Sequence, residues 1–198
     1  MRPFFLLGFF IAVCLGSCKQ AEAVYDKPYF DFDSLLNNQQ QALLLSKATL
    51  TKKVILDTTS EELTFETDSV VLAKELDVFR QLDIINKPSF KNEYRILDGL
   101  KDTRSNLTIR RYEALQQGYP VPFVTFYYQR DFSRLYKIES VYREDNALYK
   151  TERKLLLEFD DTSGKPLLVH YRLAGVQKLI LSDSISFSVD GTFVPGIF

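Results

Sequence analysis

From Tyr94 to the C-terminus, apolar and polar side chains alternate with a period of two, and this pattern limits the fold more than any other feature of the chain. Short connections separate the alternating segments, whereas a parallel pair of strands would need a crossover of about a dozen residues or more. The sequence therefore predicts an antiparallel sheet. Its expected strands are 94–100, 106–115, 122–130, 134–143, 151–160, 166–174 and 184–193.

A first helix is predicted over 35–48, where Asp33 or Ser34 is suited to cap its N-terminus. Asp31 and Asp33 form a pair of carboxylates that could also bind Ca²⁺ or serve as an acid and a base. No third acidic ligand stands at a suitable spacing, so capping is the preferred interpretation.

A hairpin and a second helix are predicted next. Segments 51–58 and 62–67 flank a turn at Thr59-Ser60, and Asp68 is placed to cap a helix over 70–85. Four apolar side chains of that helix recur at helical spacing, so they should face the core. They are Leu72, Leu76, Phe79 and Leu82.

The third predicted strand is apolar on both faces, with Phe123 and Tyr127 on one and Val124, Phe126 and Tyr128 on the other. A strand of this kind must be covered on both sides. The helices can cover one face, and the other is left to enclose itself, meet a partner or hold a ligand. These five side chains are therefore the candidate ligand-binding residues.

The N-terminus has the layout of an export signal. Arg2 supplies a positive charge, residues 4–15 are apolar apart from Cys14, and Gly16 and Ser17 are small. A transmembrane helix would need about 20 apolar residues, so this segment is too short to span a bilayer. Residues 1–17 are expected to be a signal peptide.

The end of this segment, Leu15-Gly16-Ser17-Cys18, resembles the lipobox of bacterial lipoproteins. The resemblance implies cleavage between Ser17 and Cys18, a diacylglycerol on the Cys18 thiol and an N-acyl chain, typically palmitate, on the new terminus. Two or more chains anchor a protein stably. Lys19 after the cysteine implies the outer membrane, by similarity to enterobacterial sorting.

Other fates for the two cysteines are weaker. A disulfide or a metal site would need both thiols, but Cys14 leaves with the signal peptide. The remaining alternative is ordinary secretion with a free Cys18. If Cys18 is lipidated, residues 18–30 are expected to form a tether that holds the domain away from the membrane.

Residues 31–198 are expected to form a single α+β domain, a curved antiparallel sheet of about seven to nine strands with two N-terminal helices. The layout is similar to the half-barrel of periplasmic lipoprotein carriers and of their outer-membrane receptor, which implies an apolar cavity by analogy of fold alone. The aromatic-rich strands also resemble small, uncharacterised envelope lipoproteins of Bacteroidota. That resemblance implies a location and no activity.

No motif in the chain points to catalysis. The formal net charge is -1 without a basic cluster, so nucleic acid is not an expected partner. His170, the one histidine, should share a strand face with Leu168 and Arg172. The chain has no Gly-x-Ser-x-Gly motif to supply a nucleophile, and one histidine cannot build a typical zinc site alone. We therefore expect no metal, no cofactor and no catalytic residue.

The leading hypothesis is a non-enzymatic binding or assembly module of the cell envelope, anchored to the membrane and in contact with an envelope protein or an apolar ligand. One alternative is a carrier or receptor of lipids or lipoproteins in a half-barrel cavity. A second alternative is a glycan hydrolase that uses paired carboxylates. Its candidate pairs are Glu61-Glu62 and Asp160-Asp161, although acids are also common at turns.

Overall fold

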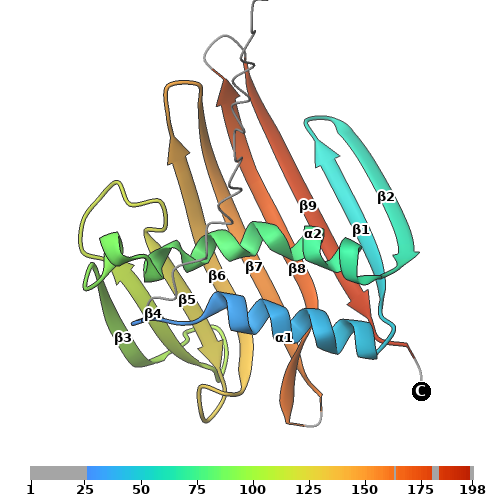
Figure 1. The fold of residues 1–198 in the computed structure, drawn as a ribbon, viewed down its shortest axis with the longest axis horizontal. Coiled ribbons are helices and arrows are strands. Elements are labelled where there is room, and N and C mark those ends of the chain that lie inside the picture. Colours follow the sequence, from blue (N-terminus) through green and yellow to red (C-terminus); the bar gives the residue numbers. More distant parts are fainter. Residues whose placement is uncertain (1–25, 163, 180–182, 197–198) are drawn as a thin grey trace, which may run out of the picture.

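The computed structural model describes residues 26–162, 164–179 and 183–196, which form an antiparallel sheet of nine strands with two helices on one face (Figure 1). The strand order is β2-β1-β9-β8-β7-β6-β5-β4-β3, so the sheet is open and not closed into a barrel. The strands are β1 (Thr49–Leu56), β2 (Thr59–Glu66), β3 (Tyr94–Lys101), β4 (Thr108–Ala114), β5 (Phe123–Tyr128), β6 (Leu135–Asp145), β7 (Tyr149–Thr162), β8 (Lys165–Leu179) and β9 (Ser184–Val194).

The predicted antiparallel sheet is confirmed, and each of the seven segments expected after residue 94 is a strand. The expectation of two N-terminal helices is met only in part. Helix α1 (Phe32–Leu45) comes first, but α2 (Ser69–Arg80) follows the β1–β2 hairpin and continues into two 3-10 helices, η1 (Gln81–Asn86) and η2 (Pro88–Phe90). The predicted signal peptide (1–17), Cys18 and the tether as far as residue 25 lie outside the described residues.

Helix α1 begins earlier than the sequence suggested. Its N-cap is Asp31, whose side chain accepts a hydrogen bond from the Ser34 backbone N–H at 3.0 Å, so the prediction of Asp33 or Ser34 was wrong. The earlier start places Phe32 in the first turn, where it is fully buried. At α2 the predicted cap is confirmed, because Asp68 accepts from the N–H groups of Val70 and Val71 at 2.8 Å.

The hairpin turn also differs from the prediction. It lies at Asp57-Thr58 and not at Thr59-Ser60, and Asp57 has a positive φ of 50°. Aspartate tolerates this left-handed conformation better than most residues. Its carboxylate also accepts the Ser186 N–H at 2.9 Å, a bond to the neighbouring strand that only the folded chain reveals.

The N-terminal hairpin pairs with the C-terminal strand, because β1 lies between β2 and β9. Their register runs from Thr49 opposite Val194 to Leu56 opposite Phe187. After β2 the chain returns along α2, which crosses the strands in the opposite direction to α1, and reaches the far edge at β3 (Figure 1). The two edges of the sheet are therefore joined by helices on one face.

The hydrophobic core fills the space between these helices and the sheet. Every side chain of the predicted α2 stripe is at most 1% exposed, which confirms that face. The sheet contributes aromatic and aliphatic side chains with 4% exposure or less, among them Phe126, Leu157, Tyr171 and Phe193. Burial of each such side chain stabilises the fold by roughly 1.5–3 kcal/mol before entropy is counted.

The helices leave part of their own side of the sheet uncovered, since β6 to β9 extend beyond them at one end (Figure 1). The strand register places four exposed apolar side chains on this side, in line with the buried core residues. They are Leu56, Leu63, Leu179 and Ile185, with exposures from 37% to 66%.

Among the described residues, no helix is long and apolar enough to span a bilayer.

Candidate functional site

The face of the sheet opposite the helices, called the open face below, divides the five predicted ligand residues into two groups. Val124 and Phe126 are fully buried on the helix side, and Tyr128 there is 7% exposed. Phe123 and Tyr127 lie on the open face and are half-buried. The alternation read from the sequence places each side chain correctly, but the five do not line one surface.

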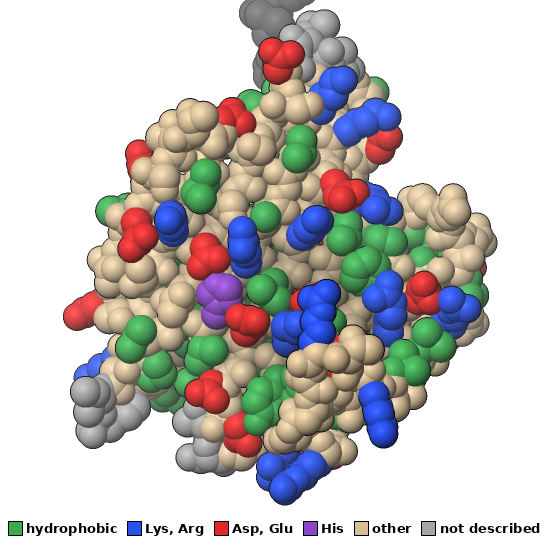
Figure 2. Space-filling view, turned by 180° about the vertical axis from the view of Figure 1, so that it is seen from behind, with side chains coloured by type: hydrophobic (Ala, Val, Ile, Leu, Met, Phe, Trp, Pro, Cys, Tyr) green, Lys and Arg blue, Asp and Glu red, His purple; other side chains and the backbone are tan. Residues whose placement is uncertain are grey.

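The open face carries charges of both signs with apolar side chains between them (Figure 2). Many of these charges pair across neighbouring strands. The distances are 2.6 Å for Arg95–Glu113, 2.8 Å for Arg143–Glu152 and 2.7 Å for Lys150–Asp145. Exposed pairs contribute about 1 kcal/mol or less each, so this network of ion pairs hydrates the open face more than it stabilises the fold.

Tyr127 is held within this network. Its hydroxyl donates to Glu139 at 2.7 Å, and the Lys137 ammonium lies 4.0 Å from the ring centroid and 2.9 Å from Glu139. Partial burial, followed by the hydrogen bond to Glu139, raises the pKa of the Tyr127 hydroxyl well above its usual value. Tyr127 therefore stays protonated and orients Glu139.

His170 lies on the open face between two carboxylates. Nδ1 is 2.8 Å from Glu158 and Nε2 is 3.0 Å from Asp190. Both ring nitrogens are thus engaged, and neither is available to activate a hydroxyl nucleophile. The predicted companion Arg172 shares this face, but Leu168 does not, because the β7–β8 register shifts there and turns Leu168 into the core with 0% exposure.

A shallow groove of about 510 Å³ crosses the centre of the open face. It is lined by residues of four adjacent strands, β5 to β8. Its lining residues are Phe123, Glu139, Ser140, Val141, Lys154, Leu155, Leu156, Arg172 and Ala174. Because Val141 is only 9% exposed while Leu156 is half-buried, the apolar floor is accessible chiefly along β7.

Two cations, Lys154 and Arg172, project from neighbouring strands at this groove. Lys154 opposes Ala174, and Arg172 opposes Leu156, so the two residues are diagonal neighbours whose Cα atoms are roughly 7–8 Å apart. Both side chains are exposed. Within the described parts of the chain, no carboxylate lies within ion-pair distance of either.

A third cation, Arg111, borders the groove. Its guanidinium lies 4.1 Å from the Phe123 ring centroid and donates to the Thr125 hydroxyl at 3.1 Å. These contacts cover Thr125, which is only 4% exposed. The groove thus combines an apolar floor with a basic rim, a feature that the sequence analysis missed because its members come from five strands.

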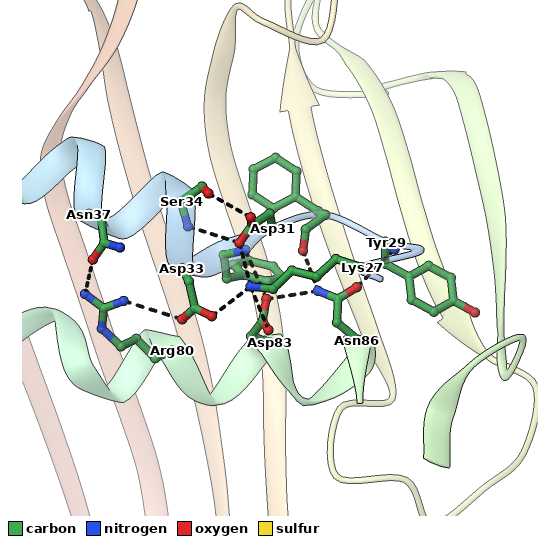
Figure 3. A network of polar contacts seen from close by, with 11 residues as sticks. Lys27, Tyr29, Asp31, Asp33, Ser34, Asn37, Arg80, Asp83 and Asn86 are labelled. Carbon is green, nitrogen blue, oxygen red and sulfur yellow. Dashed lines mark hydrogen bonds and ion pairs between the residues drawn. The ribbon is translucent and has the colours of Figure 1, made fainter. Parts of the chain in front are cut away.

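Three carboxylates, Asp31, Asp33 and Asp83, lie within 4.8 Å of one another at the start of α1 (Figure 3). Asp83 of η1 is the third acid that the local spacing lacked. The centre of the group is taken by the Lys27 ammonium, at 2.7 Å from Asp31, 2.7 Å from Asp33 and 3.1 Å from Asp83. An ammonium at this position supplies the positive charge that a metal ion would bring.

This Lys27 cluster is a structural tie. Burial disfavours its charged groups, but hydrogen bonds from Lys27 and Ser34 outweigh that effect and lower the pKa of Asp31 to about 2. The three carboxylates likewise outweigh burial and raise the pKa of Lys27. For Asp83 burial dominates and raises the pKa. The cluster fixes the segment before α1 against η1.

The acidic pairs suggested for hydrolysis are not brought together. Glu61-Glu62 lies on the edge strand β2, whereas Asp160-Asp161 lies near the end of β7, and these strands are not neighbours in the sheet. Asp161 accepts the Gly164 N–H at 2.8 Å, and Gly164 has a φ of 82°. Asp161 therefore stabilises the β7–β8 turn from the end of the strand, as acids commonly do.

No family model, curated protein or solved structure matches the chain.

Proposed function

We propose that the chain is a non-enzymatic binding or assembly module of the bacterial cell envelope, attached to the outer membrane through acyl chains on Cys18. The open face of the sheet is its contact surface. The observation that carries this proposal is the groove at the centre of that face, where an apolar floor meets cations that have no ion-pair partner among the described residues.

The remainder of the open face supports a binding role over a catalytic one. His170 is held by two carboxylates, and the Tyr127 hydroxyl is bound to Glu139. Among the described residues, the buried carboxyl group is Asp83, which is ion-paired with Lys27. Catalytic pairs of acids need unlike surroundings in a shared cleft, so the hydrolase alternative has less support.

The anchor is tested by mass spectrometry of the mature N-terminus purified from membranes. A terminal Cys18 carrying diacylglycerol and an N-acyl chain is expected. An unmodified Cys18, or a terminus elsewhere, would exclude the lipoprotein assignment.

The contact surface is tested by photo-crosslinking in intact cells. A photoreactive residue at Ala174, in the groove, should crosslink to one envelope component, and the same residue at Gln41, exposed on α1, should not. Equal crosslinking from both positions, or none from Ala174, would contradict a contact role for the open face.

The second candidate function is a carrier or receptor of apolar ligands, in which the sheet curves as a half-barrel. Four exposed apolar side chains on the helix side of the sheet favour it, namely Leu56, Leu63, Leu179 and Ile185. The filled space beneath the helices opposes it, because residues such as Phe32 and Phe126 are fully buried and contact each other there. An acyl chain would have to lie beyond the helices or displace them.

Native mass spectrometry of delipidated protein with added palmitate distinguishes this candidate. A one-to-one complex that is lost in a Leu56→Glu variant would support a carrier. Equal adduct formation by the variant and by the original chain would show nonspecific attachment and exclude it.

A further inference from the structure

We propose that the groove on the open face binds an extended, acidic segment of a partner protein, in which two carboxylates and an apolar side chain stand at alternate positions and so face the groove together. This inference rests on the proposed binding function and names the chemistry of its partner. Lys154 and Arg172 would receive the carboxylates, and Leu156 would receive the apolar side chain.

The site is located by two cations without an ion pair that lie beside an apolar floor, whereas Lys53 and Lys178, which also have no ion pair among the described residues, lie outside the groove. Around the groove, Arg95, Lys137, Arg143 and Lys150 each have a carboxylate within 2.9 Å. Lys154 and Arg172 are exposed at the groove itself and, within the described residues, have no carboxylate within 4.0 Å. Asp190 lies opposite Arg172 on β9, but its carboxylate contacts His170 Nε2 at 3.0 Å. Among the described residues, the groove therefore combines two cations without an ion pair and an apolar floor.

The spacing of the two cations suits an extended chain. Diagonal neighbours on adjacent antiparallel strands are about 7–8 Å apart, and alternate residues of an extended chain are about 6.6–6.8 Å apart and point the same way. Two carboxylates at positions i and i+2 of a partner segment can thus reach both cations together. Arg172 can bind a carboxylate through two parallel N–H donors.

The shallow shape of the groove favours a protein segment over an anionic lipid. A sheltered acyl chain needs a cavity that encloses most of its surface, but this groove is open along one side of a sheet. A protein partner covers such a groove with its own surface. The exposed ion pairs around it then form the polar rim that is typical of protein interfaces.

Selection from a random library of 12-residue peptides, displayed on phage against the whole mature chain, tests the inference. The enriched peptides should contain Asp or Glu at two alternate positions and an apolar residue at the next alternate position. Their affinity should fall by about tenfold or more in a Lys154→Glu/Arg172→Glu variant, because two attractive contacts become repulsive. A Lys53→Glu/Lys178→Glu variant makes the same change of charge on the open face outside the groove and should change the affinity by less than about twofold.

Each other outcome overturns the inference. Enriched peptides without acidic residues, or acidic peptides that both variants bind equally, would show that the groove does not select for acidic segments. Vesicles of phosphatidylglycerol form a second arm. Binding to them that only the groove variant loses, with no peptide enriched, would assign the groove to an anionic lipid. The crosslinking experiment at Ala174 does not depend on any of these results, so it tests the proposed binding function independently of the acidic-segment inference.

Discussion

The two faces of the sheet are built from alternate residues of the same strands, yet they are stabilised in different ways. On β8, Tyr171 is 1% exposed in the core and donates to Glu75 at 2.5 Å, while the next residue, Arg172, is exposed in the groove. The helix side excludes water and depends on packing. The open face keeps its charges in water and balances most of them in pairs.

This difference indicates where the molecule can change without unfolding. Truncation of a buried aromatic side chain removes packing energy, whereas each exposed ion pair contributes little to the free energy of unfolding. Side chains of the helix side are thus constrained by stability, and those of the open face are free to serve a partner.

The largest expected effect is at adjacent residues of β5. Phe126→Ala should destabilise the fold by about 3–5 kcal/mol, because Phe126 is fully buried and its ring contacts Phe30, Phe32, Tyr112 and Phe132. Tyr127→Ala, on the open face, should cost about 1 kcal/mol. Urea unfolding followed by circular dichroism measures both. Similar losses at the two positions would contradict the division into a packed and an open face.

A second test adds volume on the helix side. A Cβ at Gly191 would overlap the ring of Tyr171, which is buried and cannot move aside easily. Gly191→Ala should therefore destabilise by about 2–3 kcal/mol. Thr192→Ala, on the open face of the same strand, is the matched control and should change the unfolding free energy by about 0.5 kcal/mol or less. An unchanged midpoint for Gly191→Ala would mean that this core adapts readily.

Much of the sheet could be predicted from the sequence because period two is a local signal. Each strand after Tyr94 was found, and the opposite orientations of Phe123 and Phe126 follow from alternation. Where alternation breaks, the prediction failed. The register shift between Glu158 and Phe159 in the β7–β8 pair turns Leu168 towards the core. No local sequence pattern predicts such an irregularity.

Strand order and the candidate site depend on contacts between distant residues. Nothing local shows that β1 pairs with β9, or that Asp83 completes a group with Asp31. The groove likewise needs Phe123 and Arg172 to be brought together by four paired strands. Aromatic content predicted an apolar surface, but the cations beside it appear only once the register is known.

A third test concerns the Lys27 cluster, a group of charges on the helix side, where Lys52 and Glu75 form another ion pair at 2.7 Å. Lys27→Met keeps the aliphatic stem and removes the ammonium from three carboxylates, so a loss of about 2 kcal/mol is expected. Thermal unfolding at pH 7 measures it. Adding Asp83→Asn should recover part of the loss, since one unbalanced buried charge is then removed. If Lys27→Met unfolds at the same temperature as the original chain, the cluster does not hold the segment before α1 in place.

The same cluster predicts a smaller, pH-dependent effect. The pKa of Asp31 is about 2 in the folded chain against an ordinary value of 3.8, so its contribution is complete above pH 3.8 and is lost as the pH falls towards 2. Protonation of Asp83 acts in the opposite direction, because its pKa is raised. Unfolding free energies measured from pH 5 to pH 2 should therefore fall less steeply in an Asp31→Asn variant, whose asparagine still caps α1. Equal slopes would mean that Asp31 is not the acid-sensitive group.

The smallest effect is expected for an ion pair of the open face. Arg143 and Glu152 are 2.8 Å apart with side chains about half exposed, at 53% and 49%. Water screens such a pair, so a double-mutant cycle of Arg143→Ala and Glu152→Ala should give a coupling energy below about 1 kcal/mol. A coupling as large as the loss in Lys27→Met would mean that the open face is stabilised by its charges. Those charges would then belong to the fold, and the surface left for a partner would shrink to the groove alone.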